Sequence, residues 1–155
     1  MIIRWLFLIL CLAAPIGVGP LAGEQNNDNS WLVVVNQDSE LTALSHKQVM
    51  SLFLGRVQFL PGGSRVKTFD FPMDSAIRAS FYHSLTGKNI ADIDAYWARL
   101  RYSGRASPPQ VLGSGEAIIK RVSEHQAGLA YLPFEFADTL ADNGLKAVLI
   151  MGNIR

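Results

Sequence analysis

The sequence predicts an α/β fold, a single compact lobe in which a mainly parallel or mixed sheet is flanked by helices. Two observations support this prediction. Short apolar runs rich in β-branched residues alternate with longer stretches of helical periodicity. Strands that alternate with helices in this way indicate an α/β layer. A chain of 155 residues is also long enough for one domain to bury its own core.

The first third of the predicted domain holds a strand, a helix and a turn. The run WLVVVN at 31–36 is apolar almost throughout, which is typical of a strand buried on both faces. Ser45 and Gln48 have the spacing of a capping box, so we expect a helix to begin there and to end at Gly55. The sequence LPGG at 60–63 predicts a tight turn.

The middle of the chain predicts a strand and two helices. RVKTFDF at 65–71 has the composition of a second strand. Residues 74–85 carry apolar side chains at intervals of four, with Asp74 as the expected N-terminal cap. Asn89 caps a third predicted helix. The sequence YSGRASPPQ at 102–110 is expected to be a loop, because it is rich in turn-forming residues.

The last part of the chain predicts a fourth helix, two further strands and a short helix between those strands. The fourth helix begins near Ser114 and places isoleucine and valine on one face. The runs GLAYLP at 128–133 and LKAVLI at 145–150 predict the third and fourth strands. We expect a short helix over 134–142, which Gly144 ends.

The N-terminal residues have the layout of a secretory signal peptide. One basic residue, Arg4, precedes a short apolar run that breaks at Pro15, too early for a membrane-spanning helix. We expect residues 1–23 to be removed on export and residues 24–30 to form a flexible lead-in, leaving a single domain at 31–155. An uncleaved anchor is the alternative. The only cysteine, Cys11, lies in this leader, so the mature chain has no disulfide and no cysteine metal site.

Composition excludes several classes of function. Without Arg4 the chain has 14 − 1 = 13 basic residues against 13 acidic ones, so the mature net charge is about zero. Nucleic-acid binding is not expected, because it requires a clustered basic surface. Export without disulfides favours the periplasm of a Gram-negative bacterium. After cleavage of the leader, no membrane association is expected.

Three segments resemble the phosphate-binding-protein-like family, the periplasmic substrate-binding components of phosphate ABC transporters. They are LSHKQVMSLFLGRVQFLPGG, DSAIRASFYHSLTGKNIADIDAYWARLRYSGRASPPQ and HQAGLAYLP. The resemblance implies a periplasmic-binding-protein type II-like fold, with a length similar to that of one lobe of the usual two-lobed clamshell. It also implies a transport-related, non-enzymatic role in solute binding.

The resemblance carries over little of the family's anion-binding segment. Ser75 matches the family's serine, but Ala76 stands at its glycine and Ile77 at its threonine. Phe71 occupies the place of an arginine four residues before that serine. The loop that the first lobe contributes in full-length family members has no counterpart here.

The candidate ligand-binding residues are Ser75, Arg78 and Asp74, at the predicted start of the helix over 74–85. A helix N-terminus favours anions, and a serine hydroxyl and a guanidinium would add donors. The carboxylate of Asp74 has the opposite effect. A negative charge about 4 Å from a phosphate would repel it by roughly 1 to 4 kcal/mol. A helix with an aspartate cap and no ligand is therefore the alternative.

A second basic group consists of Arg99, Arg101 and Arg105. With Arg78 and Lys88 it forms a possible docking patch for an anion or partner, although cations at a helix C-terminus also have a purely structural role. Core spacing predicts that Trp97 on the third helix is buried, whereas Tyr102 and Phe59 are candidates for exposed contacts.

No catalytic residues, cofactor or metal ligands are predicted. The three histidines lack ligand spacing, and no GxSxG sequence is present. Two functions remain open. The first is a solute-binding protein that takes phosphate or another small anion. The second is a ligand-less interaction or sensor module beside an envelope transporter, receptor or sensor protein, and an exposed apolar patch on the surface that a second lobe would face would favour it.

Overall fold

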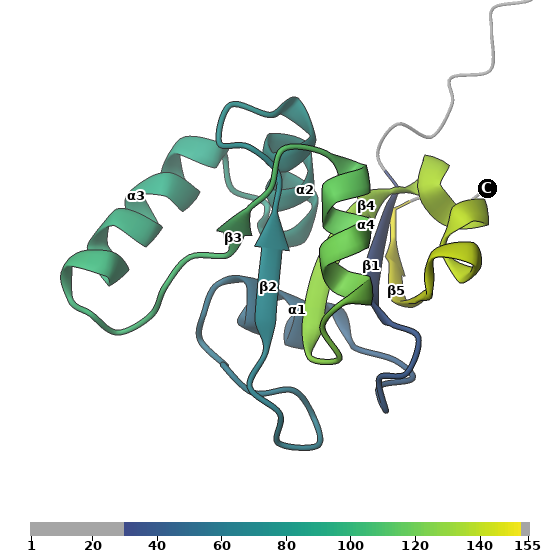
Figure 1. Cartoon of the computed structure of the whole chain (residues 1–155). Coiled ribbons are helices and arrows are strands. Elements are labelled where there is room, and N and C mark those ends of the chain that lie inside the picture. The colour runs from purple at the N-terminus through teal and green to yellow at the C-terminus, as the bar shows by residue number, and fades with distance from the viewer. Residues whose placement is uncertain (1–29, 153–155) are drawn as a thin grey trace, which may run out of the picture.

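The computed structural model describes residues 30–152, which form a five-stranded mixed sheet with helices on both faces (Figure 1). The predicted leader and residues 24–29 lie outside the described part. The strands are β1 (Trp31–Asn36), β2 (Lys67–Asp70), β3 (Gln110–Val111), β4 (Gly128–Pro133) and β5 (Leu145–Met151). The helices are α1 (His46–Phe53), α2 (Ala76–Thr86), α3 (Ile90–Tyr102), α4 (Gly115–Ser123), η1 (Phe134–Thr139) and η2 (Ala141–Asn143), the last two being 3₁₀ helices.

The strand order in the sheet is β3-β2-β4-β1-β5. β2 runs parallel to both β3 and β4, whereas β1 is antiparallel to β4 and to β5. The predicted α/β class with a mainly parallel or mixed sheet is therefore confirmed. The carboxyl ends of the three parallel strands lie at one end of the sheet. We call this end, with the following segments 71–75, 112–114 and 134–136, the carboxyl edge.

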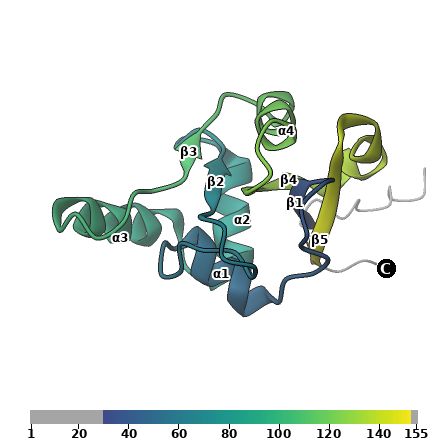
Figure 2. The same ribbon diagram turned by 60° about the horizontal axis from the view of Figure 1, so that its bottom comes forward.

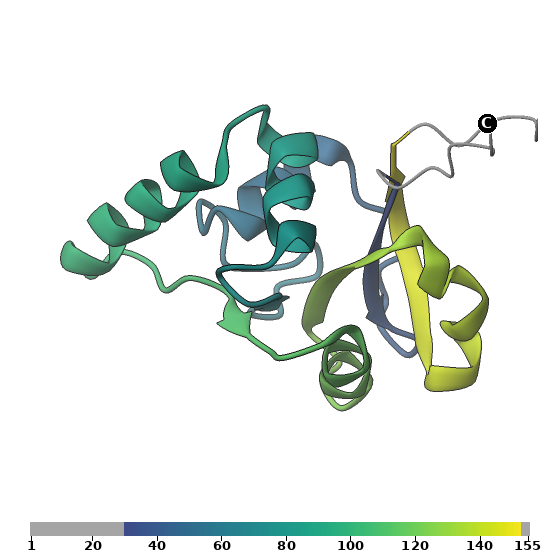
Figure 3. The same cartoon turned by 90° about the horizontal axis from the view of Figure 1, so that it is seen from above.

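The helices form two layers around the sheet. Seen from above, α4 lies on one face and α1 and α2 lie on the other, while α3 projects away from the sheet beyond α2 (Figure 3). The view turned by 60° shows the same separation of α4 from α1 and α2 (Figure 2). Within residues 30–152, no helix combines the length and the apolar character needed to cross a membrane.

The core between the sheet and the α1–α2 layer is aromatic. The Tyr131 ring on β4 stacks on that of Phe81 from α2, with centroids 3.5 Å apart and planes 3° from parallel. Trp31 and Phe53 meet both rings edge-on. Such rings bury a large apolar area each, so this cluster is a major source of stability.

The sequence predictions match the observed elements in type, with two differences. The predicted 102–110 loop ends in the two-residue strand β3, and the predicted helix over 134–142 is a pair of 3₁₀ helices. Gln110 begins β3 because the chain there lies beside Phe69 of β2 and extends the sheet by two residues. Short 3₁₀ segments are common as connectors, and η1 and η2 join β4 to β5 in this way.

Capping explains why α1 begins where it does. The Ser45 hydroxyl accepts the Gln48 N–H at 3.3 Å, and the Gln48 side chain accepts the Ser45 N–H at 2.8 Å, so the predicted capping box is confirmed. Gly55 follows the helix with a positive φ of 65°. A Cβ atom there would lie 2.8 Å from the Trp97 ring. Any residue other than glycine at position 55 would therefore meet both backbone strain and a steric clash.

Candidate functional site

The predicted ligand-binding residues lie at the carboxyl edge, where the chain leaves β2 and enters α2. In open α/β sheets, ligands bind outside the carboxyl ends of the parallel strands. Ser75 precedes the first residue of α2, and Arg78 belongs to its first turn. The structure therefore places Ser75, Arg78 and Asp74 at the end of the sheet where a ligand is expected. Their side chains have different environments.

Arg78 is buried and is held by two carboxylates. Its Nε donates to Asp70 Oδ2 at 3.1 Å, and one terminal nitrogen donates to Asp94 Oδ1 at 2.8 Å. The Arg78 and Asp70 side chains are only 5% and 3% exposed. Burial lowers the pKa of the Arg78 guanidinium, but Asp94 and Asp70 together outweigh burial and raise it above the ordinary value. Arg78 therefore links the end of β2 to α3 through α2.

Asp70 is the centre of this buried network. Besides Arg78, it accepts hydrogen bonds from the hydroxyls of Tyr131 at 2.5 Å and Tyr82 at 3.1 Å. The backbone N–H of Phe71 donates to the same carboxylate at 2.8 Å. Burial raises the pKa of the Asp70 carboxyl, while the bonds from Tyr131 and Arg78 hold it down. Burial and the Asp70 charge also raise the pKa of Tyr82 and of Tyr131 well above the usual range.

The prediction that Asp74 caps α2 is wrong. The N-terminal cap position falls on Ser75, whose side chain makes no capping hydrogen bond. The Ser75 N–H donates to the Pro72 carbonyl at 3.0 Å, so a tight turn precedes the helix and moves its start past Asp74. The Asp74 side chain is exposed. Among the four α-helices, α2 differs from α1, α3 and α4, whose cap residues all accept a backbone N–H.

The rest of the carboxyl edge combines exposed apolar side chains with carboxylates. Met73 follows β2, Val111 ends β3 and Phe134 follows β4, and their exposed fractions are 59%, 48% and 37%. Because β2 lies between β3 and β4, these residues follow three adjacent strands. The exposed carboxylates of the same edge are those of Asp74 and Glu135, and the exposed Glu116 follows it at the start of α4.

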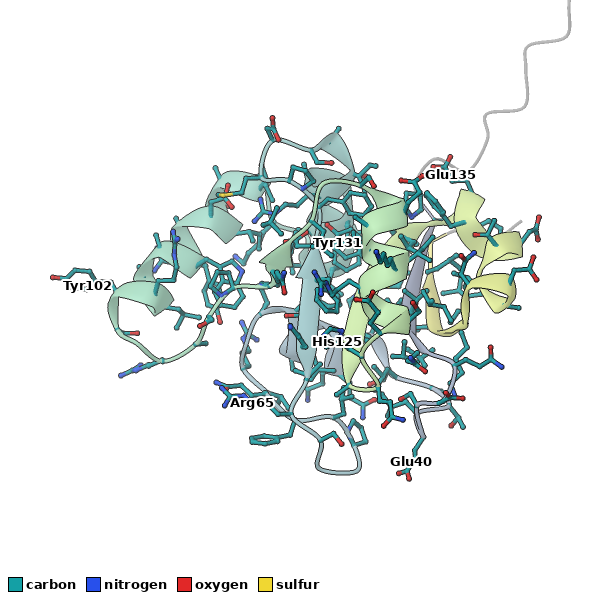
Figure 4. The ribbon with its side chains drawn as sticks, viewed as in Figure 1. Glu40, Arg65, Tyr102, His125, Tyr131 and Glu135 are labelled. Carbon is teal, nitrogen blue, oxygen red and sulfur yellow. The ribbon has the colours of Figure 1, made fainter. Side chains whose placement is uncertain are left out.

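Glu116, beside this edge, has a carboxyl group whose ionised form is favoured. Its own backbone N–H and the Ser114 hydroxyl lower the pKa of its carboxyl below the usual value. It lies in the first turn of α4, where a negative charge also complements the helix dipole. Figure 4 shows Glu135 near the end of the sheet toward which β2 points, and Arg65 near the opposite end. The carboxyl edge thus carries negative charge.

The predicted docking patch is divided in the structure. Arg99 and Arg101 lie in the last turn of α3 and are exposed, as is Arg105 in the segment that returns to β3. Arg78 does not belong to this surface, because its guanidinium is buried between Asp70 and Asp94, so that part of the prediction is wrong.

The aromatic predictions are confirmed. Trp97 is buried, with 4% exposure, against the segment around Gly55. Tyr102 and Phe59 are exposed, as expected of candidates for surface contacts. Within the described residues, no three histidine, cysteine, aspartate or glutamate side chains converge as a metal site would require.

Reasoning from the sequence alone missed the buried network and the apolar part of the carboxyl edge. One clue to the network was available. Arg78 and Tyr82 are four residues apart, so they share a face of α2, and Asp70 is the buried last residue of the strand just before that helix. The exposure of Met73, Val111 and Phe134 depends on how strand ends align across the sheet, which the local sequence does not determine.

The fold described above is similar to part of several solved structures. Solved structures with the same fold include an ABC-type phosphate transport receptor from Vibrio cholerae (16% identity, TM-score 0.59) and PstS from Borrelia burgdorferi (12% identity, TM-score 0.61). A third, from Clostridium perfringens, is described as a phosphate ABC transporter substrate-binding protein with bound phosphate (14% identity, TM-score 0.58).

Each of these comparisons covers 77% of this chain and 44–46% of the other chain. The chain therefore spans less than half the length of these phosphate-transport proteins, and it matches one of their lobes. The similarity at this level of identity establishes the fold alone. No family model and no curated protein matches the chain in sequence.

Proposed function

We propose that the protein is an exported, non-enzymatic module of the bacterial cell envelope that binds a protein partner through its carboxyl edge. The observation that carries this proposal is the burial of Arg78 between Asp70 and Asp94. The Arg78 guanidinium, the candidate phosphate ligand, is instead bound by these two carboxylates and stabilises the fold. What the same edge offers to solvent is apolar side chains and carboxylates.

The charges at the carboxyl edge oppose phosphate capture. A phosphate site needs unsatisfied N–H groups, hydroxyls and a free cation. Here Asp74, Glu116 and Glu135 are exposed at the ends of three neighbouring segments. Each would repel a phosphate dianion, and no free cation from Arg78 offsets that repulsion.

The same charges suit a protein partner with a complementary surface. A core of apolar contacts surrounded by polar residues is the usual anatomy of a protein–protein interface. Met73, Val111 and Phe134 supply apolar contacts, and the neighbouring carboxylates favour a partner whose contact surface is apolar at its centre and rich in lysine or arginine around it. The predicted signal peptide at 1–23 supports a location in the periplasm of a Gram-negative bacterium.

Site-specific photo-crosslinking in the envelope of the producing cell tests this proposal. With benzoylphenylalanine at position 73, we expect a discrete crosslinked adduct, because Met73 is 59% exposed at the carboxyl edge. The control position is Tyr102, which is 98% exposed at the end of α3 and should give no such adduct. Adding Glu135→Lys should reduce the yield, because it reverses a charge facing the partner. Equal adducts from both positions, or none, would contradict the proposal.

A second candidate function is capture of phosphate or another small anion at the start of α2. One observation favours it. Ser75 leaves the first N–H groups of α2 without a side-chain cap, and one terminal nitrogen of Arg78 makes no hydrogen bond. A helix N-terminus with open N–H groups attracts anions. This candidate makes a distinct prediction, since a phosphate titration would then perturb the backbone amides at the start of α2.

A further inference from the structure

A groove of about 340 Å³ lies away from the carboxyl edge, beside the start of β2. Its walls are the segment after α1, the residues that lead into β2 and the segment that returns from α3 to β3. Its lining residues come from 52–58, 65–68 and 104–110. Arg65, one of them, lies at the end of the sheet opposite Glu135 (Figure 4). We call this feature the basic groove.

The charge of the basic groove is positive. Arg65, Lys67 and Arg105 line it, and among the described residues no aspartate or glutamate does so. In the part of the chain that the structure describes, the ion pairs involve other residues, so these three cations have no carboxylate partner. Cations that line one groove without a counter-charge favour a bound anion.

Hydrogen bonds hold the two walls of the groove together. An Arg65 terminal nitrogen donates to Gln58 Oε1 at 3.2 Å, and Gln58 Nε2 donates to the Arg105 carbonyl at 3.3 Å. Gln58 therefore bridges the walls, holding the side chain of Arg65 and the backbone of Arg105. Lys67 contributes the stem of its side chain to the lining, whereas its Nζ lies 3.4 Å from His125 Nε2 and over the Phe69 ring, outside the groove. The groove has defined walls, which distinguishes it from a scatter of surface charges.

Apolar side chains also line the groove. Leu52, Val57 and Pro108 line it beside the cations. The polar groups near them, Thr68 and Gln110, can donate hydrogen bonds. A ligand that suits these walls has at least two anionic oxygens for the cations and a small carbon skeleton for the apolar side chains.

We propose that the basic groove binds a small organic anion with two or more negative charges, of carboxylate or phosphate chemistry. The site is separate from the carboxyl edge, and it does not depend on the partner proposed for that edge. Isolated exposed ion pairs contribute little, but a groove with defined walls and several donors can bind a polyvalent anion with useful affinity.

Calorimetric titration with two probes tests the proposal. Citrate represents polyvalent carboxylates and glycerol 3-phosphate represents phosphate esters, so the preferred probe identifies the chemistry. We expect saturable one-to-one binding of at least one probe. Arg65→Gln and Arg105→Gln should each weaken that binding by about tenfold, the loss expected for one charge-assisted hydrogen bond. Higher salt should weaken binding further, since the groove is open to solvent.

Arg101→Gln is the matched control, because it removes an exposed arginine near the end of α3 that does not line the groove. It should leave the affinity unchanged. All three variants alter exposed side chains, and their thermal unfolding should match that of the unmodified protein, which shows that they fold. Absence of saturable binding with both probes at millimolar concentration would overturn the proposal. So would binding that the two groove variants and the control affect equally.

Discussion

Replacing Arg78 by methionine is expected to destabilise the protein by about 3–5 kcal/mol, the cost of breaking a buried ion pair by removing one partner. The substitution keeps a long side chain in the space between β2 and α3 but leaves the Asp70 carboxylate without its cation. The Tyr131 and Tyr82 hydroxyls still donate to it, although neither carries a compensating charge. Urea unfolding of the variant beside the unmodified protein measures the difference in unfolding free energy.

The pH dependence of the stability lost in Arg78→Met tests whether the unpaired Asp70 carboxylate causes that loss. Burial already raises the pKa of Asp70 above its ordinary value of 3.8, and removal of Arg78 raises it further. A carboxyl group with a raised pKa in the folded state contributes stability that is present below its unfolded pKa and is lost as the pH rises through the folded pKa. The cost of Arg78→Met should therefore grow as the pH increases from below 3.8 to neutrality.

Arg99→Met is the matched control for this prediction. It removes the same type of side chain from an exposed position in the last turn of α3. We expect it to change the unfolding free energy by no more than about 0.5 kcal/mol, as is usual for surface substitutions. If Arg78→Met were as mild as Arg99→Met, Arg78 would not be structural, and the argument against a ligand-binding arginine would fail.

Phe81→Ala is expected to cost a similar amount, about 3–5 kcal/mol, which is the usual range for removing a buried phenylalanine ring. Phe81 is fully buried, and its ring stacks on that of Tyr131 and meets those of Trp31 and Phe53 edge-on. The variant would leave a cavity between the sheet and α2. It would also remove the support of the ring whose hydroxyl donates to Asp70.

Phe59→Ala provides the comparison for the same change of residue type at the surface. Phe59 is 55% exposed and should tolerate the substitution with a change of at most about 0.5 kcal/mol. Both variants can be followed by urea unfolding under identical conditions. A small effect of Phe81→Ala would mean that the aromatic cluster is not the centre of the core.

Most of the fold is predictable from the sequence because its elements have strong local determinants. The Ser45–Gln48 capping box, the Asn89 cap and the apolar strand at 31–36 each depend on a few neighbouring residues. β3 has no such determinant. Its two residues become a strand only because β2 offers an open edge beside them, which is a tertiary effect.

The candidate site was harder to predict for a similar reason. The position of Ser75 and Arg78 at the end of β2 follows from the order of elements. The role of Arg78 depends on Asp94, sixteen residues away on α3, and on Tyr131, which lies on another strand. Asp74 was expected to cap α2 because of its residue type, but the turn from Pro72 to Ser75 places the cap one residue later.

The basic groove shows the same limit. Closeness in sequence groups Arg105 with Arg99 and Arg101. The structure brings it to a groove that Arg65 also lines, forty residues earlier in the chain. Gln58, which belongs to no motif, bridges the Arg65 side chain and the Arg105 backbone carbonyl. In a chain of near-zero net charge, charged residues indicate binding surfaces only once the fold has separated them. Here the fold separates them into an acidic carboxyl edge and a basic groove elsewhere on the molecule.

The most direct test of the proposed function is a phosphate titration of the ¹⁵N-labelled protein followed at the backbone amides of residues 75–78. This readout reports on the start of α2 alone, so binding at the basic groove would not be mistaken for it. We predict no saturating shift of these amides at millimolar phosphate, because Arg78 is buried in its ion pairs and Asp74 is exposed beside the helix start. Saturating shifts at these amides that Ser75→Ala abolishes would contradict the proposal and would establish capture of phosphate at the carboxyl edge.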